Sequence, residues 1–482
     1  MIIFKRIHTV LLLLTFLLSG ILVALGQDTH YWSQQFGTRT ALMSGAVIGG
    51  ANDNTMIWYN PGGLGFLENA SISINANAYR LENIKIYNAL GDRGDFKSKN
   101  LGSVPLLVGG MINLKNSEWK LGYTIVVPMD FKFKGIARVD GNFNVIDDAI
   151  SPGNEELVGE SALSNKVNEV VGGIGIGRKI GDNLSVGLTN LITVRSHTYN
   201  RSYSAYIFQN NAEESFIGGN LLQNVDYYNI RYSMKLGLIY RMEPWSFGIT
   251  LTTPSLNIGG QGTTAANVAA KNVLFEDGER KSGVATDRQA ELKTKYKSPA
   301  SLAVGVNYDS GKHAFGIAAQ YFSSIDIYDI MEVTPGTFVR PADLAPDISS
   351  DEFLNVRSAA TSVLNVALGY EYTVDESLSF MIGGRSDMSY FDNDLNDGNG
   401  IRTTISSWDL YHFSLGATFT RTNSSLSLGI LYSTGTTGDY EQSGNLSNPT
   451  EGDLLKGATT ITQADYNSFG FLLGYTFYFR KF

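Results

Sequence analysis

The stretch Ser468–Phe479, SFGFLLGYTFYF, alternates large apolar side chains with small or polar ones. One face would carry Phe469, Phe471, Leu473, Tyr475, Phe477 and Phe479, and the other Ser468, Gly470, Leu472, Gly474, Thr476 and Tyr478. A period of two residues is typical of a β-strand. One face therefore suits hydrocarbon and the other a polar or tightly packed interior.

The same alternation recurs along the chain and predicts fourteen strands. They are Ala70–Tyr79, Val104–Asn113, Glu118–Phe133, Val167–Ile180, Asn183–Ser196, Asn229–Met242, Trp245–Ile258, Arg288–Tyr308, Lys312–Ile327, Ser358–Tyr372, Glu376–Tyr390, Thr404–Thr420, Asn423–Thr434 and Tyr466–Lys481. A soluble sandwich also alternates, but with its apolar face inward. Aromatic residues at the strand ends on the apolar face, as at Tyr240, Tyr308 and Tyr475, instead indicate a membrane girdle.

The links between these strands alternate between short turns and long loops. The long loops are Arg80–Ser103, Lys134–Lys166, His197–Tyr228, Gly259–Asp287, Tyr328–Arg357, Phe391–Thr403 and Gly435–Asp465. Short periplasmic turns and long outer loops characterise up-and-down barrels of the outer membrane. We therefore predict an all-β fold, a 14-stranded antiparallel up-and-down transmembrane β-barrel, as a multi-pass protein of the bacterial outer membrane.

The first residues and the composition agree with export. Residues 1–26 carry Lys5 and Arg6, an apolar run and a small-residue cleavage site, which predicts a signal peptide. The chain has no cysteine, so disulfides contribute nothing to its stability. Its formal net charge is −9, which argues against nucleic acid as a partner. The expected domains are the signal peptide 1–26, an N-terminal plug 27–69 and the barrel 70–482.

The plug is predicted from residues 41–67, ALMSGAVIGGANDNTMIWYNPGGLGFL. Small residues permit close backbone approach, and the Asn60-Pro61 and Gly62-Gly63 steps favour turns. Such a segment does not build a core of its own and is better suited to packing inside another structure. A fourteen-stranded barrel has a lumen too wide for side chains alone to fill. We therefore expect this segment, including Asp53, Trp58 and Tyr59, to fold back into the lumen as a hatch.

The order of these features resembles the start of the FadL/TodX family of outer-membrane transporters for hydrophobic compounds. The matching residues are Ser44-Gly45-Ala46, Asn52-Asp53-Asn54 and Asn60-Pro61-Gly62-Gly63-Leu64, with Asn52 in place of an acid and Gly62 in place of the usual alanine. Residues 120–131, with an internal proline, are similar to the third strand of that family, and residues 237–254 to its mid-barrel hairpin.

The resemblance implies passive uptake of hydrophobic small molecules, such as long-chain fatty acids, through a pocket against the hatch. The expected partners are such a ligand and outer-membrane lipid, with no cofactor and no nucleic acid. The alternative is a barrel of the same fold that does not transport and serves as a surface or secretion-complex adaptor, binding another protein through its long outer loops.

Pro128 is the candidate for a lateral exit, because proline cannot donate to a strand ladder and so interrupts the barrel wall. The alternative is a strand that ends near Val127. Asn60 and Pro61 are expected to hold the hatch turn. Asp53 is expected either to anchor the hatch to a basic lumen residue or to line a solvated pore.

Further candidate site residues divide into two sets. The basic lumen residues are Arg195, Arg231, Lys235 and Arg385, any of which could meet Asp53 or the carboxylate head of a ligand. The loop aromatics are Tyr203, Tyr206 and Phe208, which would either capture a ligand or pack against neighbouring loops.

Catalytic and metal-binding patterns are absent from the sequence. The four histidines after the signal form no His-x-x-x-His pair, and no Gly-x-Ser-x-Gly turn occurs. His412 with the nearby Ser414 could belong to a barrel hydrolase, but both are predicted to face the lumen. We therefore expect no enzymatic activity, no catalytic residue and no metal.

Overall fold

The computed structural model describes residues 29–479 apart from 52, 93, 115–116, 212–214, 275–277, 337, 341–348, 396–399, 438–439, 444–445, 452–453, 455–457 and 462. The expected signal peptide 1–26, Asn52 of the hatch motif and the last residues of the final predicted strand lie outside the described residues.

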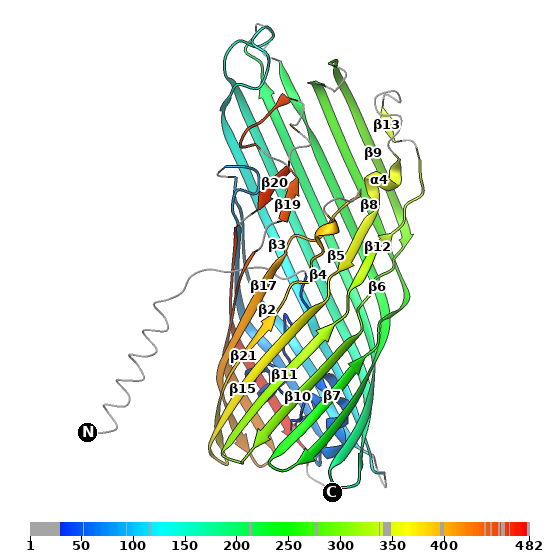
Figure 1. Cartoon of the computed structure of the whole chain (residues 1–482), viewed down its shortest axis with the longest axis vertical. Helices are drawn as coiled ribbons and strands as arrows, with labels where there is room; N and C mark the ends of the chain where they lie inside the picture. The colour runs from blue at the N-terminus through cyan, green and yellow to red at the C-terminus, as the bar shows by residue number, and fades with distance from the viewer. Residues whose placement is uncertain are drawn as a thin grey trace, which may run out of the picture.

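Within the described residues, fourteen antiparallel strands close into a barrel (Figure 1). They are β1 (Ser71–Ile86), β2 (Phe96–Asn113), β3 (Trp119–Phe143), β4 (Glu155–Ile180), β5 (Leu184–Phe208), β6 (Phe216–Met242), β7 (Trp245–Thr252), β10 (Ser301–Asp309), β11 (His313–Phe322), β15 (Val363–Asp375), β16 (Leu378–Asp387), β17 (Trp408–Arg421), β18 (Ser424–Thr437) and β21 (Ala464–Tyr478). The last strand pairs with the first, from Ser71 opposite Tyr478 to Ile86 opposite Ala464. Closure leaves no sheet edge, so no edge strand exposes unpaired N–H and C=O groups to the bilayer.

The two faces of the strands are oriented as the alternation predicts. In β21, Phe471, Leu473 and Tyr475 are exposed, whereas Leu472 and Thr476 are buried. Large apolar side chains are exposed in the same way on the other barrel strands, as the bilayer requires of a lipid-facing surface. The predicted fold class is confirmed.

The outer halves of β3, β4, β5 and β6 correct the predicted loops. These strands have 25, 26, 25 and 27 residues, whereas about 9–11 residues cross a bilayer. Most of the predicted loops Lys134–Lys166 and His197–Tyr228 is therefore strand. The outward-facing residues of these outer halves are mostly polar, because they lie beyond the hydrocarbon. A search for strands with an apolar outward face therefore misses them.

Four predicted strands are each divided in two. Trp245–Ile258 is interrupted after Thr252, where β7 gives way to β8 (Leu256–Leu274), and the inner part of β6 pairs with β7 while its outer part pairs with β8. The predicted loop Gly259–Asp287 is therefore mostly strand. The other three divided strands have β9 (Arg280–Lys293) before β10, β12 (Ile325–Met331) after β11 and β14 (Val356–Ala360) before β15. The remaining short elements are β13 (Val339–Arg340), α4 (Ser350–Leu354), η2 (Asn393–Leu395), β19 (Tyr440–Ser443) and β20 (Ala458–Ile461).

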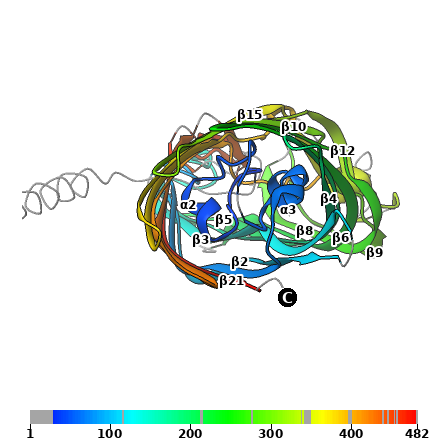
Figure 2. The same ribbon diagram turned by 90° about the horizontal axis from the view of Figure 1, so that it is seen from below.

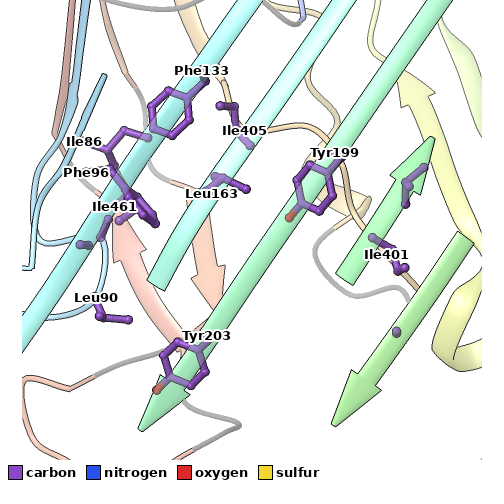
Figure 3. Close-up of a cluster of buried hydrophobic side chains, with 14 of the residues drawn as sticks. Ile86, Leu90, Phe96, Phe133, Leu163, Tyr199, Tyr203, Ile401, Ile405 and Ile461 are labelled. Atoms are coloured by element: carbon purple, nitrogen blue, oxygen red, sulfur yellow. The ribbon is translucent and has the colours of Figure 1, made fainter. Parts of the chain in front are cut away.

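The outer half of the barrel has a hydrophobic core of its own. Phe96 of β2, Phe133 of β3 and Leu163 of β4 pack there with Tyr203 of β5, facing residues of the outer loops such as Ile405 (Figure 3). Burial of this apolar surface, worth about 25 cal/mol per Å², gives the long hairpins an inner support above the membrane. The loops therefore fold against the extended sheet.

The described residues of the segment 29–67 lie inside the ring of strands (Figure 2). This inserted segment contains α2 (Thr38–Leu42), α3 (Met56–Tyr59) and the 3-10 helix η1 (Pro61–Phe66). Most of its side chains are buried, and Leu42, Met56 and Leu64 are fully so. Among the described helices, none has the length and apolar character needed to cross a bilayer. The domain boundaries at residues 26 and 69 stay predictions.

The lipid-facing surface predicts a depth-dependent cost for charge. Leu368 lies near the middle of β15 and is 56% exposed, and Ile136, on the outer half of β3, is 58% exposed. We expect Leu368→Arg to lower the free energy of unfolding in lipid vesicles by about 2–4 kcal/mol, measured by denaturant titration. Ile136→Arg is the matched control and should change it little. Equal losses at the two sites would contradict the assigned membrane position.

Candidate functional site

Asn60 connects the inserted segment to the barrel wall. Its side-chain amide donates to the carbonyl oxygens of Ile48 (2.9 Å) and Leu238 (3.0 Å), and its side-chain oxygen accepts from the backbone N–H of Gly62 (3.1 Å). Pro61 occupies the first position of η1, where its missing N–H costs no hydrogen bond. The Asn-Pro-Gly-Gly stretch therefore forms a capped turn that is bound to β6.

Lumen-facing glycines of the wall lie where the inserted segment packs against it. A Cβ atom at Gly187 would meet the carbonyl of Pro61, one at Gly237 the side chain of Asn60, and one at Gly248 the carbonyl of Ile48, all at less than van der Waals distance. Only glycine lets two backbones approach so closely. At these three positions, glycine therefore allows the backbone of the insert to pack directly against the wall.

The start of the insert is tied to the opposite part of the wall. The guanidinium of Arg385 on β16 donates to the carbonyl oxygens of Trp32 (3.1 Å) and Ser33 (3.3 Å). The carboxylate of Asp387 accepts from the backbone N–H of Trp32 (2.9 Å). Arg385, one of the candidate ligand-binding residues, thus positions the insert and does not line the aromatic cavity described below.

Asp53 bonds within the inserted segment. Its carboxylate accepts from the hydroxyl of Thr40 (2.9 Å), the backbone N–H of Thr55 (2.9 Å) and the Thr55 hydroxyl. The side chain is 7% exposed. Neither expectation for Asp53 matches these contacts: it is not solvated, and its hydrogen bonds join α2 to the turn before α3 rather than to a basic lumen residue.

A cavity of about 180 Å³ lies between the insert and the wall. Aromatic side chains supply much of its lining, and Tyr31 stacks between Phe322 and Tyr390 with ring centroids 4.3 and 4.5 Å apart. Trp58 and Tyr59 of the hatch motif also line it. The cavity therefore has an aromatic surface to which both the insert and the wall contribute.

One side of the cavity carries a buried cluster of charges. The carboxylate of Glu169 on β4 accepts from Arg195 of β5 (2.8 Å) and from Arg231 of β6 (2.7 Å), both at the same oxygen. Both guanidinium groups lie over the ring of Tyr296, 4.1 and 4.9 Å from its centroid. Two cations share one carboxylate, which leaves the cluster with an excess positive charge.

Lys235 lies on the same strand as Arg231 and contacts the insert. Its ammonium group donates to the carbonyl oxygen of Trp58 (2.7 Å) and lies 4.1 Å from the centroid of the Trp58 indole. Three of the four basic candidates, Arg195, Arg231 and Lys235, therefore meet at the cavity.

The wall beside the cavity is interrupted between β2 and β3. Their ladder runs from Asn113 opposite Lys120 to Leu107 opposite Val126 and then stops. In this register the next residue of β2 on the same face, Pro105, would lie opposite Pro128 of β3. Neither proline has an N–H to donate. Pro128 and Met129 line the cavity, which therefore reaches the interruption.

Beyond the interruption the two strands are joined through side chains instead of a ladder. The side-chain amide of Asn100 donates to the carbonyl oxygen of Lys132 (2.6 Å), and the backbone N–H of Lys134 donates to the hydroxyl of Ser98 (2.9 Å). On its other side β3 stays paired with β4, with a register shift between Val126 and Met129. The strand therefore continues past Pro128, and the alternative that it ends near Val127 is wrong.

The loop aromatics are strand residues that do not reach the cavity. Tyr203 is buried in the outer core, where its hydroxyl donates to the carbonyl oxygen of Leu454 (2.7 Å). Tyr206 and Phe208 lie on the outer face of β5 and pack against Phe216. Placing these residues in a long loop was wrong, for the reason given above for the long hairpins.

Sequence reasoning missed Pro105, Glu169 and Tyr296. Pro105 lies in the second predicted strand, but counting back from the predicted turn puts it opposite Val126. Only the observed register, with Asn113 opposite Lys120, sets it against Pro128. Glu169 lies within the predicted strand Val167–Ile180, but the sequence does not show which basic side chains it meets. No local pattern marks Tyr296, which lies in the irregular segment between β9 and β10.

Comparisons with solved structures identify the same architecture. A FadL homologue of Pseudomonas aeruginosa matches with a TM-score of 0.57 at 13% identity, over 95% of this chain and 99% of that chain. The Pseudomonas putida toluene transporter TodX matches with a TM-score of 0.55 at 10% identity, over 93% of this chain and all of that one (100%). The Ralstonia pickettii toluene transporter TbuX matches with a TM-score of 0.53 at 12% identity, over 93% and 99%.

The closed wall and its apolar exterior define a transmembrane β-barrel of the outer-membrane type. Its fold is that of the FadL/TodX barrels, so the predicted resemblance is confirmed at the level of the fold. No protein-family model matches the sequence, and no curated protein matches it significantly.

The contacts of Asn60 predict how firmly the insert is held. In Asn60→Ala, three hydrogen bonds are lost, two of them buried and one partly buried, at a total cost of about 2–4 kcal/mol. We expect faster amide hydrogen exchange in residues 41–67, measured by mass spectrometry, with exchange in β10–β18 unchanged. Asn200→Ala, at an exposed position of β5, is the control. Unchanged exchange in 41–67 would show that the insert is held by other contacts.

Proposed function

We propose that this protein carries small hydrophobic molecules passively across the outer membrane. The observation that supports this most is the aromatic cavity, which lies against the insert and reaches the wall at Pro128. Pockets of this kind, mostly apolar with a few convergent polar groups, are typical small-molecule sites. The toluene transporters TodX and TbuX, which share the fold, support the same class of cargo.

The inserted segment acts in this proposal as a hatch. It contacts β6 through Asn60, β16 through Arg385, and β17 through a hydrogen bond from the hydroxyl of Ser414 to the carbonyl of Leu42 (2.8 Å). A ligand that enters from the outer side meets this packed segment below the cavity. The straight path to the periplasm is therefore blocked, and water-soluble molecules do not leak through.

The interruption between β2 and β3 acts as the lateral exit. A hydrophobic ligand gains free energy by moving from a partly polar cavity into the hydrocarbon of the bilayer. A missing stretch of ladder beside Pro105 and Pro128 separates the two strands without unpairing β3 from β4. The ligand then enters the membrane directly and does not pass through periplasmic water at this step.

A second candidate function is that of a surface adaptor for another protein. The observation that favours it is the size of the outer structure, because β3–β6 extend well beyond the length needed to cross the bilayer. Of the two candidate functions, the cavity favours transport, because an adaptor requires no cavity that reaches the wall.

Closing the wall tests the lateral exit. In the double variant Pro105→Val/Pro128→Val, both positions regain an N–H, and valine favours a strand. We expect the ladder to extend past Leu107 and Val126. Uptake of a fluorescent hydrophobic ligand by proteoliposomes should fall by roughly ten-fold, while the single Pro128→Val variant gives a smaller decrease.

The matched control is Pro152→Val, a proline in an outer turn away from the cavity. It should transport like the unaltered protein. Unimpaired uptake by a double variant that folds normally would exclude this interruption as the exit.

A further inference from the structure

The size of the cavity limits the ligand. A cavity of about 150 Å³ accommodates benzene, and the cavity here measures about 180 Å³. There is room for one ring with a small substituent. A long-chain fatty acid has more than twice as many carbon atoms as benzene, so much of its chain would have to lie outside this space.

The lining favours a ring. Tyr31, Phe322 and Tyr390 already form a stack, and Trp58 and Tyr296 present further aromatic surface to the same cavity. Aromatic pairs contribute about 0.5–1.5 kcal/mol beyond the apolar area that they bury. A planar ligand therefore has partners in this cavity that an acyl chain does not use.

The charges favour an anion. Four basic side chains and one carboxylate line the cavity: Arg195, Arg231, Lys235, Lys297 and Glu169. The Glu169 carboxylate is shared by two guanidinium groups, so it neutralises only one of them. A second carboxylate, brought by the ligand, would balance the buried pair.

Arg231 supplies an unused donor at this place. Its Nε donates to the hydroxyl of Ser298 (2.7 Å) and its Nη2 to Glu169 (2.7 Å), but its Nη1 is buried with no hydrogen-bond partner among the described residues. The residue is 4% exposed and lines the cavity. A buried donor without a partner is costly, and an acceptor on a ligand removes that cost.

We propose that the cavity selects compact aromatic acids, with the carboxylate bound by Arg231 and the ring among the tyrosines. The proposal rests on the transport function argued above and narrows its ligand class. It differs from the sequence-based expectation of long-chain fatty acids and from an uncharged hydrocarbon, because the first exceeds the cavity and the second leaves Arg231 Nη1 without an acceptor.

The test is equilibrium binding to the purified full chain in detergent, followed by the fluorescence of the cavity tryptophans or by calorimetry. The probes are benzoate, toluene and palmitate. We expect benzoate to bind at least about ten-fold more tightly than toluene, because a hydrogen bond to a charged group is worth that much or more. Palmitate should bind more weakly than benzoate.

The variant that isolates the contact is Arg231→Lys, which keeps the positive charge but loses the second terminal nitrogen. It should lower the affinity for benzoate about ten-fold and leave toluene binding unchanged, which a general disturbance of the cavity would not do. Arg138→Lys, at an exposed arginine on the outer half of β3, is the matched control and should alter neither.

The outcomes separate this proposal from the proposed function. Tighter binding of toluene or palmitate than of benzoate, or benzoate binding that is insensitive to Arg231→Lys, overturns the aromatic-acid proposal while uptake of hydrophobic compounds stands. If no probe binds and proteoliposomes take up none of the three, both proposals fail.

Discussion

A polypeptide in a bilayer must pair its backbone N–H and C=O groups internally, because hydrocarbon offers them no partner. Fourteen strands of this chain meet that requirement by closing on themselves, with β21 paired to β1 along its length. The ladder between β2 and β3 does not meet this pairing requirement at one place. There Pro105 and Pro128 would face each other, and two residues without an N–H leave little to pair. The sequences of both strands therefore determine where the ladder is interrupted.

The width of the barrel creates a second requirement. Its lumen has to be filled, and residues 29–67 fill it by approaching glycines of the wall such as Gly187 and Gly248. The insert has little secondary structure, so hydrogen bonds from wall side chains to its backbone carbonyls replace internal ones. The cavity is the space that this fit leaves on the side of Glu169 and Arg231. The proposed ligand site, hatch and lateral exit therefore all depend on how one segment fits one wall.

Much of this architecture can be read from the sequence. The alternation at Phe469–Phe479 predicts which side chains face lipid, and the Asn60-Pro61 turn marks the segment that the wall encloses. The lengths of β3–β6 were missed because their outer halves have polar outward faces, like loops. The partners of Arg195 and Arg231 were missed because Glu169 and Tyr296 are brought to them only by the register of β4 and by an irregular segment. Pairing of distant residues within a lumen has no local signal.

The central claim, that a ligand leaves the cavity sideways between β2 and β3, is tested most directly by a reversible lock. The chain has no cysteine of its own, so Pro105→Cys/Pro128→Cys introduces a single pair of thiols on either side of the interruption. With the pair bridged by a disulfide or a short bifunctional thiol reagent, uptake by proteoliposomes should stop, and for the disulfide it should return on reduction. Equal uptake by the bridged and the reduced protein would contradict the account.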